Sequence, residues 1–195
     1  SLFYAAILCL LAFIVLINFN LFTILLALSS MPLAFTYPLM KRYTYWPQLF
    51  LGVTFNYGLI LAWTSISGSL NPIPIIFYIG AIFWTLGYDT IYGYQDIKDD
   101  EIIGLKSTSI KFKGTAKKFL FICYSFLLIS LLTGGYLMNF SLYYFLFLLI
   151  PFIHLFLYQI KTFDPKNPGI CLKVFKSNNL FGLLILINIF IGKIS

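Results

Sequence analysis

The chain alternates between long apolar runs and short polar links. A membrane-spanning helix needs about 20 mostly apolar residues. Seven runs are close to this length, at residues 2–17, 21–40, 46–66, 72–92, 117–137, 141–160 and 178–193. Backbone polar groups in lipid must be bonded within their own segment, which an α-helix achieves. The alternation typical of a transmembrane barrel strand does not occur along these runs. The pattern therefore predicts an all-α integral membrane protein, built as a multi-helix transmembrane bundle.

Composition supports the membrane assignment. The 195 residues are 61% hydrophobic and only 10% charged, whereas soluble domains are about 45–50% apolar and about 25% charged. No segment is left over for a soluble domain, so we expect residues 1–195 to form a single membrane domain. The run 2–17 has no basic residue before it and no small-residue cleavage site after it. It is therefore interpreted as a transmembrane helix of a chain whose true start is missing, and not as a signal peptide.

Positive charge is confined to alternate links. Twelve of the thirteen cations lie at Lys41–Arg42, in 97–118 or in 161–176, and only Lys193 lies elsewhere. Basic links on one side of the membrane are typical of the cytoplasmic side, and the alternation favours seven spans over six or eight. The net charge of +7 is explained by anionic lipid headgroups or an anionic substrate. No nucleic-acid partner is needed.

Two proline-containing segments have different interpretations. Asn71 and Pro72 are typical of a helix start, with Asn as the cap and Pro in the first turn. The stretch 164–169 (DPKNPG) is interpreted as a turn-rich loop.

Acidic residues form one cluster. Five of the six lie within thirteen positions, namely Asp89, Asp96, Asp99, Asp100 and Glu101. If the helix that begins at residue 72 continues through Asp100, then Asp89, Asp96 and Asp100 share a stripe about 40° wide. Asp96 and Asp100 form an i,i+4 pair with Cβ atoms roughly 5–6 Å apart. Asp89 lies about 16 Å deeper along such a helix and is expected to serve another part of the site.

This cluster favours a metal and diphosphate site at one membrane face. Two carboxylates held so close repel each other unless a cation lies between them, and Mg²⁺ commonly bridges one or two carboxylates to substrate phosphates. Nearby cations suited to phosphate oxygens are Lys41, Arg42, Lys106 and Lys111. The alternative is a solvated charged loop that closes a helix. The intramembrane position of Asp89 favours function, because ionisable residues inside membranes are rarely idle.

Other reactive residue types carry no comparable pattern. Cys9, Cys123 and Cys171 are far apart and are interpreted as small buried apolar residues. His154 lies inside an apolar segment and is interpreted as a packed or hydrogen-bonded core residue.

Three parts of the chain resemble motifs of UbiA-type prenyltransferases, and most closely the 4-hydroxybenzoate polyprenyltransferase group. Residues 87–92 (GYDTIY), 95–100 (QDIKDD) and 104–108 (GLKST) resemble the second aspartate-rich motif. Residues 37–48 (YPLMKRYTYWPQ) resemble the loop of this group, with its YxxxK element on Tyr37 and Lys41. Residues 171–179 resemble its last cytoplasmic loop.

The resemblance implies a fold of nine transmembrane helices, with Mg²⁺ and diphosphate at the cytoplasmic end of a central cavity. The seven spans here would be the third to the ninth. The N-terminal two helices and a first acidic motif, NDxxDxxxD, are not in this sequence, so we expect these 195 residues alone to be inactive.

The resemblance also implies the reaction. This is Mg²⁺-dependent transfer of a polyprenyl group from polyprenyl diphosphate to the ring of 4-hydroxybenzoate in ubiquinone biosynthesis, in a bacterial inner membrane or a mitochondrial one, with no obligatory protein partner. The roles expected are metal binding by Asp96 and Asp100, with Asp99 as a further or alternate ligand. Diphosphate binding is expected of Tyr37, Lys41, Arg42 and Lys106. Asp89 is expected to face the acceptor or to orient a neighbour.

The allylic cation of such a reaction is stabilised by aromatic faces. Candidates are Tyr57, Trp63, Trp84 and Tyr88, among which the sequence does not choose.

Two alternatives remain at this stage. One is a sibling enzyme that prenylates a menaquinone, haem O, tocopherol-type or chlorophyll precursor, against which the 37–48 run argues by resemblance. The other is a membrane cation transporter or channel. A transporter usually carries polar groups at the bilayer midplane in broken helices, whereas the acids here cluster at one face with lysines.

Overall fold

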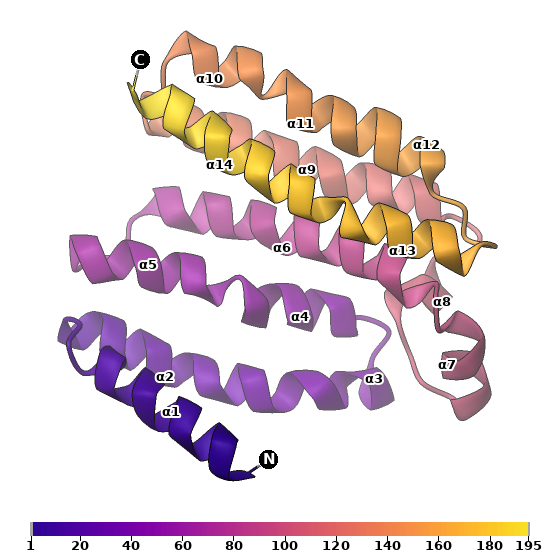
Figure 1. The fold of residues 1–195 in the computed structure, drawn as a ribbon, viewed down its shortest axis with the longest axis horizontal. Coiled ribbons are helices and arrows are strands. Elements are labelled where there is room, and N and C mark those ends of the chain that lie inside the picture. Colours follow the sequence, from indigo (N-terminus) through magenta and orange to yellow (C-terminus); the bar gives the residue numbers. More distant parts are fainter. Residues whose placement is uncertain (1, 195) are drawn as a thin grey trace.

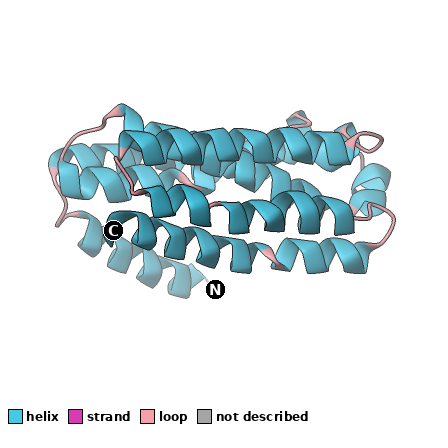
Figure 2. Ribbon diagram, turned by 90° about the horizontal axis from the view of Figure 1, so that it is seen from above, coloured by secondary structure: helices cyan, strands magenta, loops and turns pink. Residues whose placement is uncertain are grey.

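The computed structural model describes residues 2–194, and every regular element in that range is a helix. The long helices run side by side along one axis, and the links between them lie at the two ends of the bundle (Figures 1 and 2). The elements are α1 (Leu2–Leu16), α2 (Leu21–Thr36), the 3₁₀ turn η1 (Tyr37–Leu39), α3 (Met40–Tyr43), α4 (Pro47–Phe55), α5 (Tyr57–Ser67), α6 (Pro72–Gly93), α7 (Ile97–Ile103), α8 (Thr108–Lys111), α9 (Ala116–Leu137), α10 (Leu142–Phe147), α11 (Leu149–Ile153), the π-helix η2 (His154–Gln159), α12 (Ile160–Thr162), α13 (Pro168–Lys176) and α14 (Asn178–Ile194).

Six helical stretches are long and apolar enough to cross a membrane. They are Leu21–Tyr43, Pro47–Ser67, Pro72–Gly93, Ala116–Leu137, Leu142–Thr162 and Pro168–Ile194. They coincide with six of the seven predicted spans, so the fold class is confirmed and the protein is an integral membrane protein. The first predicted span corresponds to α1, which has 15 residues and is shorter than the about 20 that a span needs.

The helix start predicted at Asn71 is confirmed, because its side chain accepts a hydrogen bond from the amide of Ile73 at 3.0 Å. The loop predicted over 164–169 is too long. Pro168 begins α13, and Asn167 caps that helix by accepting from the amide of Ile170 at 3.2 Å. The same pairing of a capping Asn with a Pro in the first turn therefore starts both helices. α13 continues almost directly into α14, so the last span begins ten residues earlier than predicted.

α6 is the central helix, lying between the α4–α5 stretch and the α9 and α14 layer (Figure 1). It packs most extensively against α9. A Cβ atom on Gly87 would lie 2.7 Å from Cε1 of Tyr124, and one on Gly134 would lie 2.5 Å from Cζ of Phe77. These glycines allow the close helix approach that stabilises packing inside membranes.

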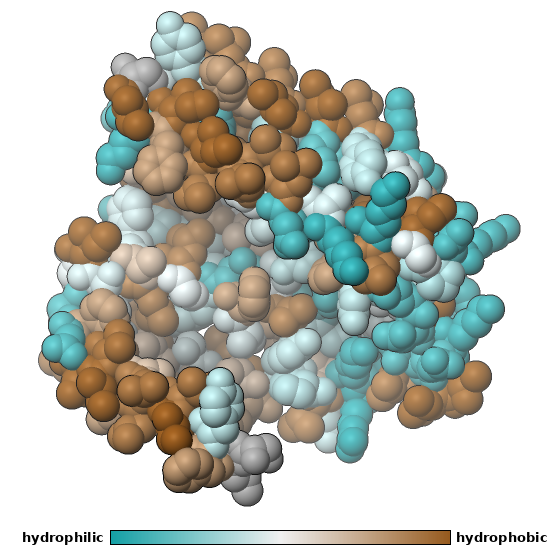
Figure 3. All heavy atoms as spheres, in the orientation of Figure 1, coloured by the Kyte–Doolittle hydropathy of each residue, from teal (hydrophilic) through white to brown (hydrophobic). Residues whose placement is uncertain are grey.

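Charged side chains gather at the end of the bundle that carries α3, α7, α8 and α13 (Figure 3). The three basic links of the sequence therefore share one end, as the alternation predicts. The C-terminus, which follows Lys193, lies at the other end (Figure 1).

Candidate functional site

The acidic cluster does not lie on one continuous helix. α6 ends at Gly93, and α7 begins at Ile97, with Asp96 as its N-cap residue. The predicted stripe through Asp89, Asp96 and Asp100 is therefore wrong. Asp89 lies on the last turns of α6, and the other two belong to α7.

Hydroxyl groups of α8 explain where α6 stops. The backbone carbonyl of Thr90 accepts a hydrogen bond from Oγ of Ser109 at 2.8 Å. The Thr90 hydroxyl also lies 2.6 Å from that of Thr108. The amide of Tyr94 turns instead to the carbonyl of Ile91, at 3.2 Å. Because the Thr90 carbonyl already accepts a hydrogen bond from another element, it does not need an amide from a further turn of α6.

Tyr94 anchors the turn between α6 and α7. Its side chain is buried, and its ring contacts that of Phe163, with 5.2 Å between centroids. Burial, with a smaller electrostatic contribution from Cys171, raises the pKa of Tyr94 to about 12. The hydroxyl is therefore neutral, and it donates to the carbonyl of Phe112 at 3.4 Å.

The predicted i,i+4 pair survives on α7. The amide of Asp100 donates to the carbonyl of Asp96 at 2.9 Å, so the two residues are one helical turn apart. Asp96 is exposed, whereas Asp100 is 7% exposed. Asp99 is exposed between them in sequence.

Asp100 is paired with a cation from a distant part of the chain. Nζ of Lys41 lies 3.5 Å from Oδ2 of Asp100. The backbone amide of Lys106 donates to the carbonyl of Lys41 at 2.8 Å, and its Nζ donates to the carbonyl of Tyr43 at 3.3 Å. α3 and the segment that follows α7 are thereby joined by both backbone and side-chain bonds.

A left-handed glycine makes that connection possible. Gly104 ends α7 with φ of 77°, a conformation that L side chains rarely adopt, and it turns the chain towards α3.

Lys41 also interacts electrostatically with Asp89, which is half-buried. Asp89 in turn interacts with Tyr37. Lys41 therefore interacts with a carboxylate of α6 as well as with one of α7. The structure brings together five residues singled out in the sequence, namely Tyr37, Lys41, Asp89, Asp100 and Lys106.

Two other basic residues near the acidic cluster, Arg42 and Lys111, do not contact these five residues in the same way. Arg42 is exposed on the same turn as Lys41. Lys111 lies with its Nζ 4.3 Å from the ring centroid of Trp46, where a cation–π contact stabilises the packing of α8 on the start of α4.

Two glutamines near the site were missed in the sequence. Gln48 is buried, and its Oε1 accepts from the amide of Thr108 at 3.0 Å, which ties α4 to α8. Gln95 directly precedes Asp96, and its Nε2 is buried with no hydrogen-bond partner among the described residues. Both positions fall inside the quoted motifs, and their amide side chains were the available signal.

The donor set suits a metal that takes most of its ligands from substrate and water. Among residues 2–194, no three His, Cys, Asp or Glu side chains form a metal-binding group. Asp96 and Asp100 supply two carboxylates on one turn. Proteins in general bind Mg²⁺ through one or two carboxylates together with substrate phosphate oxygens and waters.

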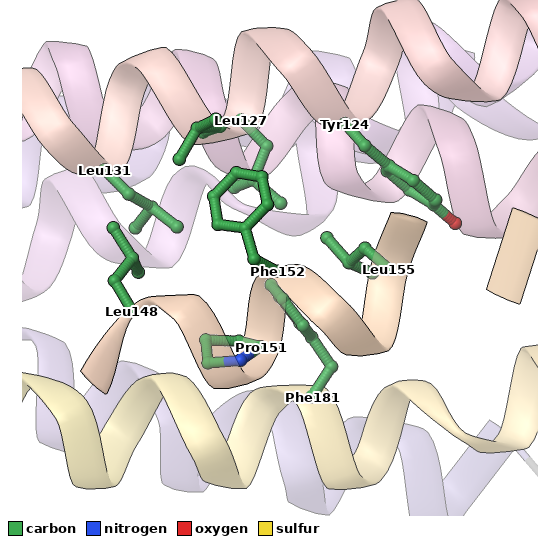
Figure 4. Close-up of a pocket in the computed structure, with 9 residues that line it drawn as sticks. Tyr124, Leu127, Leu131, Leu148, Pro151, Phe152, Leu155 and Phe181 are labelled. Carbon is green, nitrogen blue, oxygen red and sulfur yellow. The ribbon is translucent and has the colours of Figure 1, made fainter. Parts of the chain in front are cut away.

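An apolar cavity of about 500 Å³ lies among α5, α6, α9 and α14. Along α6 its wall consists of Phe77, Ala81 and Trp84. Trp84 is the one nearest in sequence to Asp89, whereas Ile66 and Met138 line the cavity at the opposite end of the bundle. The cavity therefore runs from the middle of α6 away from its acidic end. By contrast, the gap enclosed by Leu148, Phe152 and their neighbours (Figure 4) has only about 10 Å³ and is a packing defect.

Comparison with known proteins identifies the family of the chain. The model of the UbiA prenyltransferase family matches residues 1–186. The chain belongs to the UbiA prenyltransferase family. The family named by the resemblance in the sequence is thus confirmed.

Several UbiA relatives are similar over nearly the whole chain. It is 44% identical to 4-hydroxybenzoate geranyltransferase 2 of Lithospermum erythrorhizon, over 92% of this chain and 59% of the relative. It is 43% identical to the mitochondrial 4-hydroxybenzoate polyprenyltransferase of Bos taurus, over 92% of this chain and 48% of the relative. It is 39% identical to the mitochondrial 4-hydroxybenzoate polyprenyltransferase of Dictyostelium discoideum, over 93% of this chain and 39% of the relative. The chain thus spans between 39% and 59% of the length of these relatives.

A solved structure has the same fold. It was reported in a study of digeranylgeranylglyceryl phosphate synthase in membranes, and it matches with a TM-score of 0.71 at 18% identity, over 97% of this chain and 67% of that one. At this identity, the match supports the UbiA fold alone.

Proposed function

We propose that this chain carries the second half of the metal and diphosphate site of an enzyme that transfers a polyprenyl group from polyprenyl diphosphate to the ring of 4-hydroxybenzoate. The observation that carries the proposal is the meeting of Lys41 with Asp100, on the turn that also holds Asp96. Carboxylates for a metal and an ammonium group for phosphate are the two parts that such a site needs. The relatives named 4-hydroxybenzoate geranyltransferase and 4-hydroxybenzoate polyprenyltransferase support the acceptor and the prenyl group.

Asp96 and Asp100 would hold Mg²⁺, with Asp99 as a further or alternate ligand. When bound, Mg²⁺ offsets the negative charge that develops on the diphosphate leaving group. Lys41 and Lys106 direct their ammonium groups to diphosphate oxygens, and Arg42 lies at the rim of the same turn. Tyr37 donates its hydroxyl to the same anion.

The chemistry is electrophilic substitution on an aromatic ring. The bond between the allylic carbon and oxygen breaks, and its electron pair leaves with the diphosphate. A ring carbon of 4-hydroxybenzoate forms the new carbon–carbon bond, and that carbon then loses its proton. Asp89 is the carboxylate nearest to the cavity along α6, and we assign the proton to it.

The apolar cavity suits the first isoprene units of the donor, because its wall is aliphatic and aromatic. The rest of a long polyprenyl chain continues into lipid, which accounts for an active site built inside a membrane bundle. The basic end is assigned to the cytoplasmic side of a bacterial inner membrane, or to the equivalent side of a mitochondrial inner membrane. In either setting the product enters ubiquinone biosynthesis.

The test uses the complete protein, purified in detergent and reconstituted in vesicles. Prenyl diphosphate and Mg²⁺ are supplied with a panel of acceptors: 4-hydroxybenzoate and the menaquinone, tocopherol-type, chlorophyll and haem precursors. C-prenylated 4-hydroxybenzoate is the expected product, with little product from the others. Preference for another acceptor would instead identify a sibling enzyme. Cation flux through the vesicles without any prenylated product would identify a transporter.

A further inference from the structure

A buried polar network lies within the membrane-spanning part of the bundle. Its centre is Gln159 of η2, whose side chain is fully buried. Oε1 of Gln159 accepts from the hydroxyl of Tyr124 on α9 at 2.6 Å. Figure 4 shows the ring of Tyr124 beside the apolar core with its hydroxyl directed away from it. A buried polar network is stabilising when all of its members are satisfied.

The other end of Gln159 reaches the start of α14. Nε2 lies 3.1 Å from Oδ1 of Asn178, 3.2 Å from Oγ of Ser177 and 3.3 Å from Nε2 of His154. An amide nitrogen carries two hydrogens, so these three neighbours share two donors. The π-helix of η2 contains both His154 and Gln159. Such local widening of a helix is frequent at functional sites.

The network ends on one aromatic side chain. Nε1 of Trp84 donates to Oδ1 of Asn178 at 2.9 Å. Asn178 is itself held, because its Nδ2 donates to the carbonyl of Phe175 at 2.9 Å. The indole orientation is therefore fixed by Asn178, which is fixed in turn by Gln159.

The network does not hold the other tryptophan of the cavity. Trp63 also lines the wall, but its Nε1 is buried with no hydrogen-bond partner among the described residues. Of these two rings, only Trp84 is oriented by hydrogen bonds that reach three other helical segments.

Trp84 also lies between the charged residues near Asp89 and the apolar cavity. It lies five residues before Asp89 on α6, a rise of about 7.5 Å. Its ring contacts Tyr88 edge to face, with 5.2 Å between centroids, and Tyr88 interacts electrostatically with Asp89. On its other side Trp84 contacts Phe181, at 5.0 Å, which lines the cavity. Trp84 is the cavity-wall residue of α6 nearest to Asp89, so it lies on the way of a donor whose diphosphate is at Lys41 and whose chain is in the cavity.

We infer that Trp84 is the aromatic residue that faces the allylic cation, and that Asn178 and Gln159 are positioning residues that hold its ring. The inference rests on the proposed prenyl transfer. Trp is the best of the aromatic side chains for cation–π attraction, and the attraction is larger in a desolvated site. The bond changes are those of the transfer itself: the electron pair of the breaking carbon–oxygen bond leaves with diphosphate, and the ring π electrons form the new bond. Trp84 makes and breaks no bond.

The test measures kcat and KM for the prenyl diphosphate in the complete protein. Trp84→Leu removes the aromatic face and is expected to lower kcat roughly 30-fold, which corresponds to ~2 kcal/mol of cation–π attraction. KM is expected to stay within about threefold, because the diphosphate contacts remain. Trp84→Phe keeps a π face and is expected to recover most of kcat.

Phe83→Leu is the matched control. Phe83 precedes Trp84 on α6, but it stacks on Phe126, with 4.5 Å between centroids, and does not line the cavity. Its substitution is expected to leave kcat near the wild-type value.

A double-mutant cycle separates positioning from folding. Asn178→Leu is expected to lower kcat several-fold in the wild-type background. In the Trp84→Phe background it should have almost no further effect, because no Nε1–H is left to orient. Equal losses in both backgrounds would overturn the positioning role. The cycle also decides the matter if Trp84→Leu does not accumulate in membranes.

Two failures are distinguishable. If the wild-type protein prenylates 4-hydroxybenzoate and Trp84→Leu matches Phe83→Leu, or raises only KM, the role of Trp84 is wrong and the proposed function stands. If the wild-type protein forms no prenylated product, the proposed function is wrong and the inference falls with it.

Discussion

Nζ of Lys41 lies 3.5 Å from Oδ2 of Asp100, although the two residues are 59 positions apart in the chain. The carboxylate is almost buried, with 10% of its side chain exposed, whereas the lysine side chain is 45% exposed. A nearly buried carboxylate is costly without a counter-charge. A half-exposed ammonium group beside it remains able to reach an incoming anion.

Lys41→Met is expected to lower kcat/KM for the prenyl diphosphate roughly 10- to 100-fold, as for the loss of a charged hydrogen bond. The effect should appear mainly as a higher KM, because the proposed role of Lys41 is to hold the diphosphate both before and during its departure. Lys113→Met is the matched control: Lys113 lies at the same end of the bundle but pairs with Glu101 at 2.8 Å. Similar losses in both variants would point to a general effect of surface charge.

Metal dependence provides a separate prediction. EDTA should abolish prenyl transfer, and Mg²⁺ should restore it. Asp96→Asn is expected to raise the Mg²⁺ concentration needed for half-maximal activity roughly 10-fold or more, because a carboxylate ligand is replaced by a neutral amide.

Asp99→Asn serves as the comparator for that titration. Asp99 is exposed, and its substitution should shift the Mg²⁺ requirement less than Asp96→Asn does. A larger shift for Asp99→Asn would exchange the roles assigned to the two residues.

Asp89→Asn tests the proton acceptor. Loss of a positioned general base typically lowers the rate 10²–10⁴-fold, so kcat is expected to fall by about 100-fold or more. KM for the diphosphate should change little. An Asn side chain has nearly the same shape, so insertion and folding are preserved. A variant with wild-type kcat and a raised KM would assign Asp89 to the orientation of Lys41 instead.

The close packing of α6 on α9 makes a prediction about stability. Gly87→Ala places a Cβ 2.7 Å from the ring of Tyr124. Overpacking of this kind costs roughly 1–3 kcal/mol, so the apparent melting temperature in detergent should fall by about 2–10 °C. Gly58→Ala is the control, since no atom lies within 4 Å of its added Cβ, and it should melt at or above the wild-type temperature.

The helices were predictable because their apolar length is a local property of the sequence. The early start of α13 was also within reach, because Asn167 and Pro168 form the same capping pair that was recognised at Asn71 and Pro72. The turn residues between Asp164 and Asn167 outweighed that signal.

The end of α6 was not predictable in the same way. It depends on the hydroxyl of Ser109 reaching the carbonyl of Thr90, a contact between elements that the periodicity of one segment does not contain. Gly93 was the one local hint. Because α6 ends there, the separation of Asp89 and Asp100 cannot be calculated from the rise along one continuous helix.

Some of the residues of the candidate site were predictable from the sequence. Chemistry and resemblance selected Lys41 and Asp100, and the fold brings them together. The orientation of Trp84 was beyond reach, because it is set by Asn178 and Gln159, which lie 94 and 75 positions further along the chain.

The most direct measurement compares two acid substitutions on α7 in the complete protein, with prenyl transfer to 4-hydroxybenzoate as the readout. Asp100→Ala should reduce product formation by about 100-fold or more while the protein still inserts in the membrane, because it removes both a proposed metal ligand and the partner of Lys41. Glu101→Ala, the next residue on the same helix, should leave the rate near wild type. Near-normal transfer by Asp100→Ala, or equal loss in both variants, would contradict the assignment of this turn as the metal and diphosphate site.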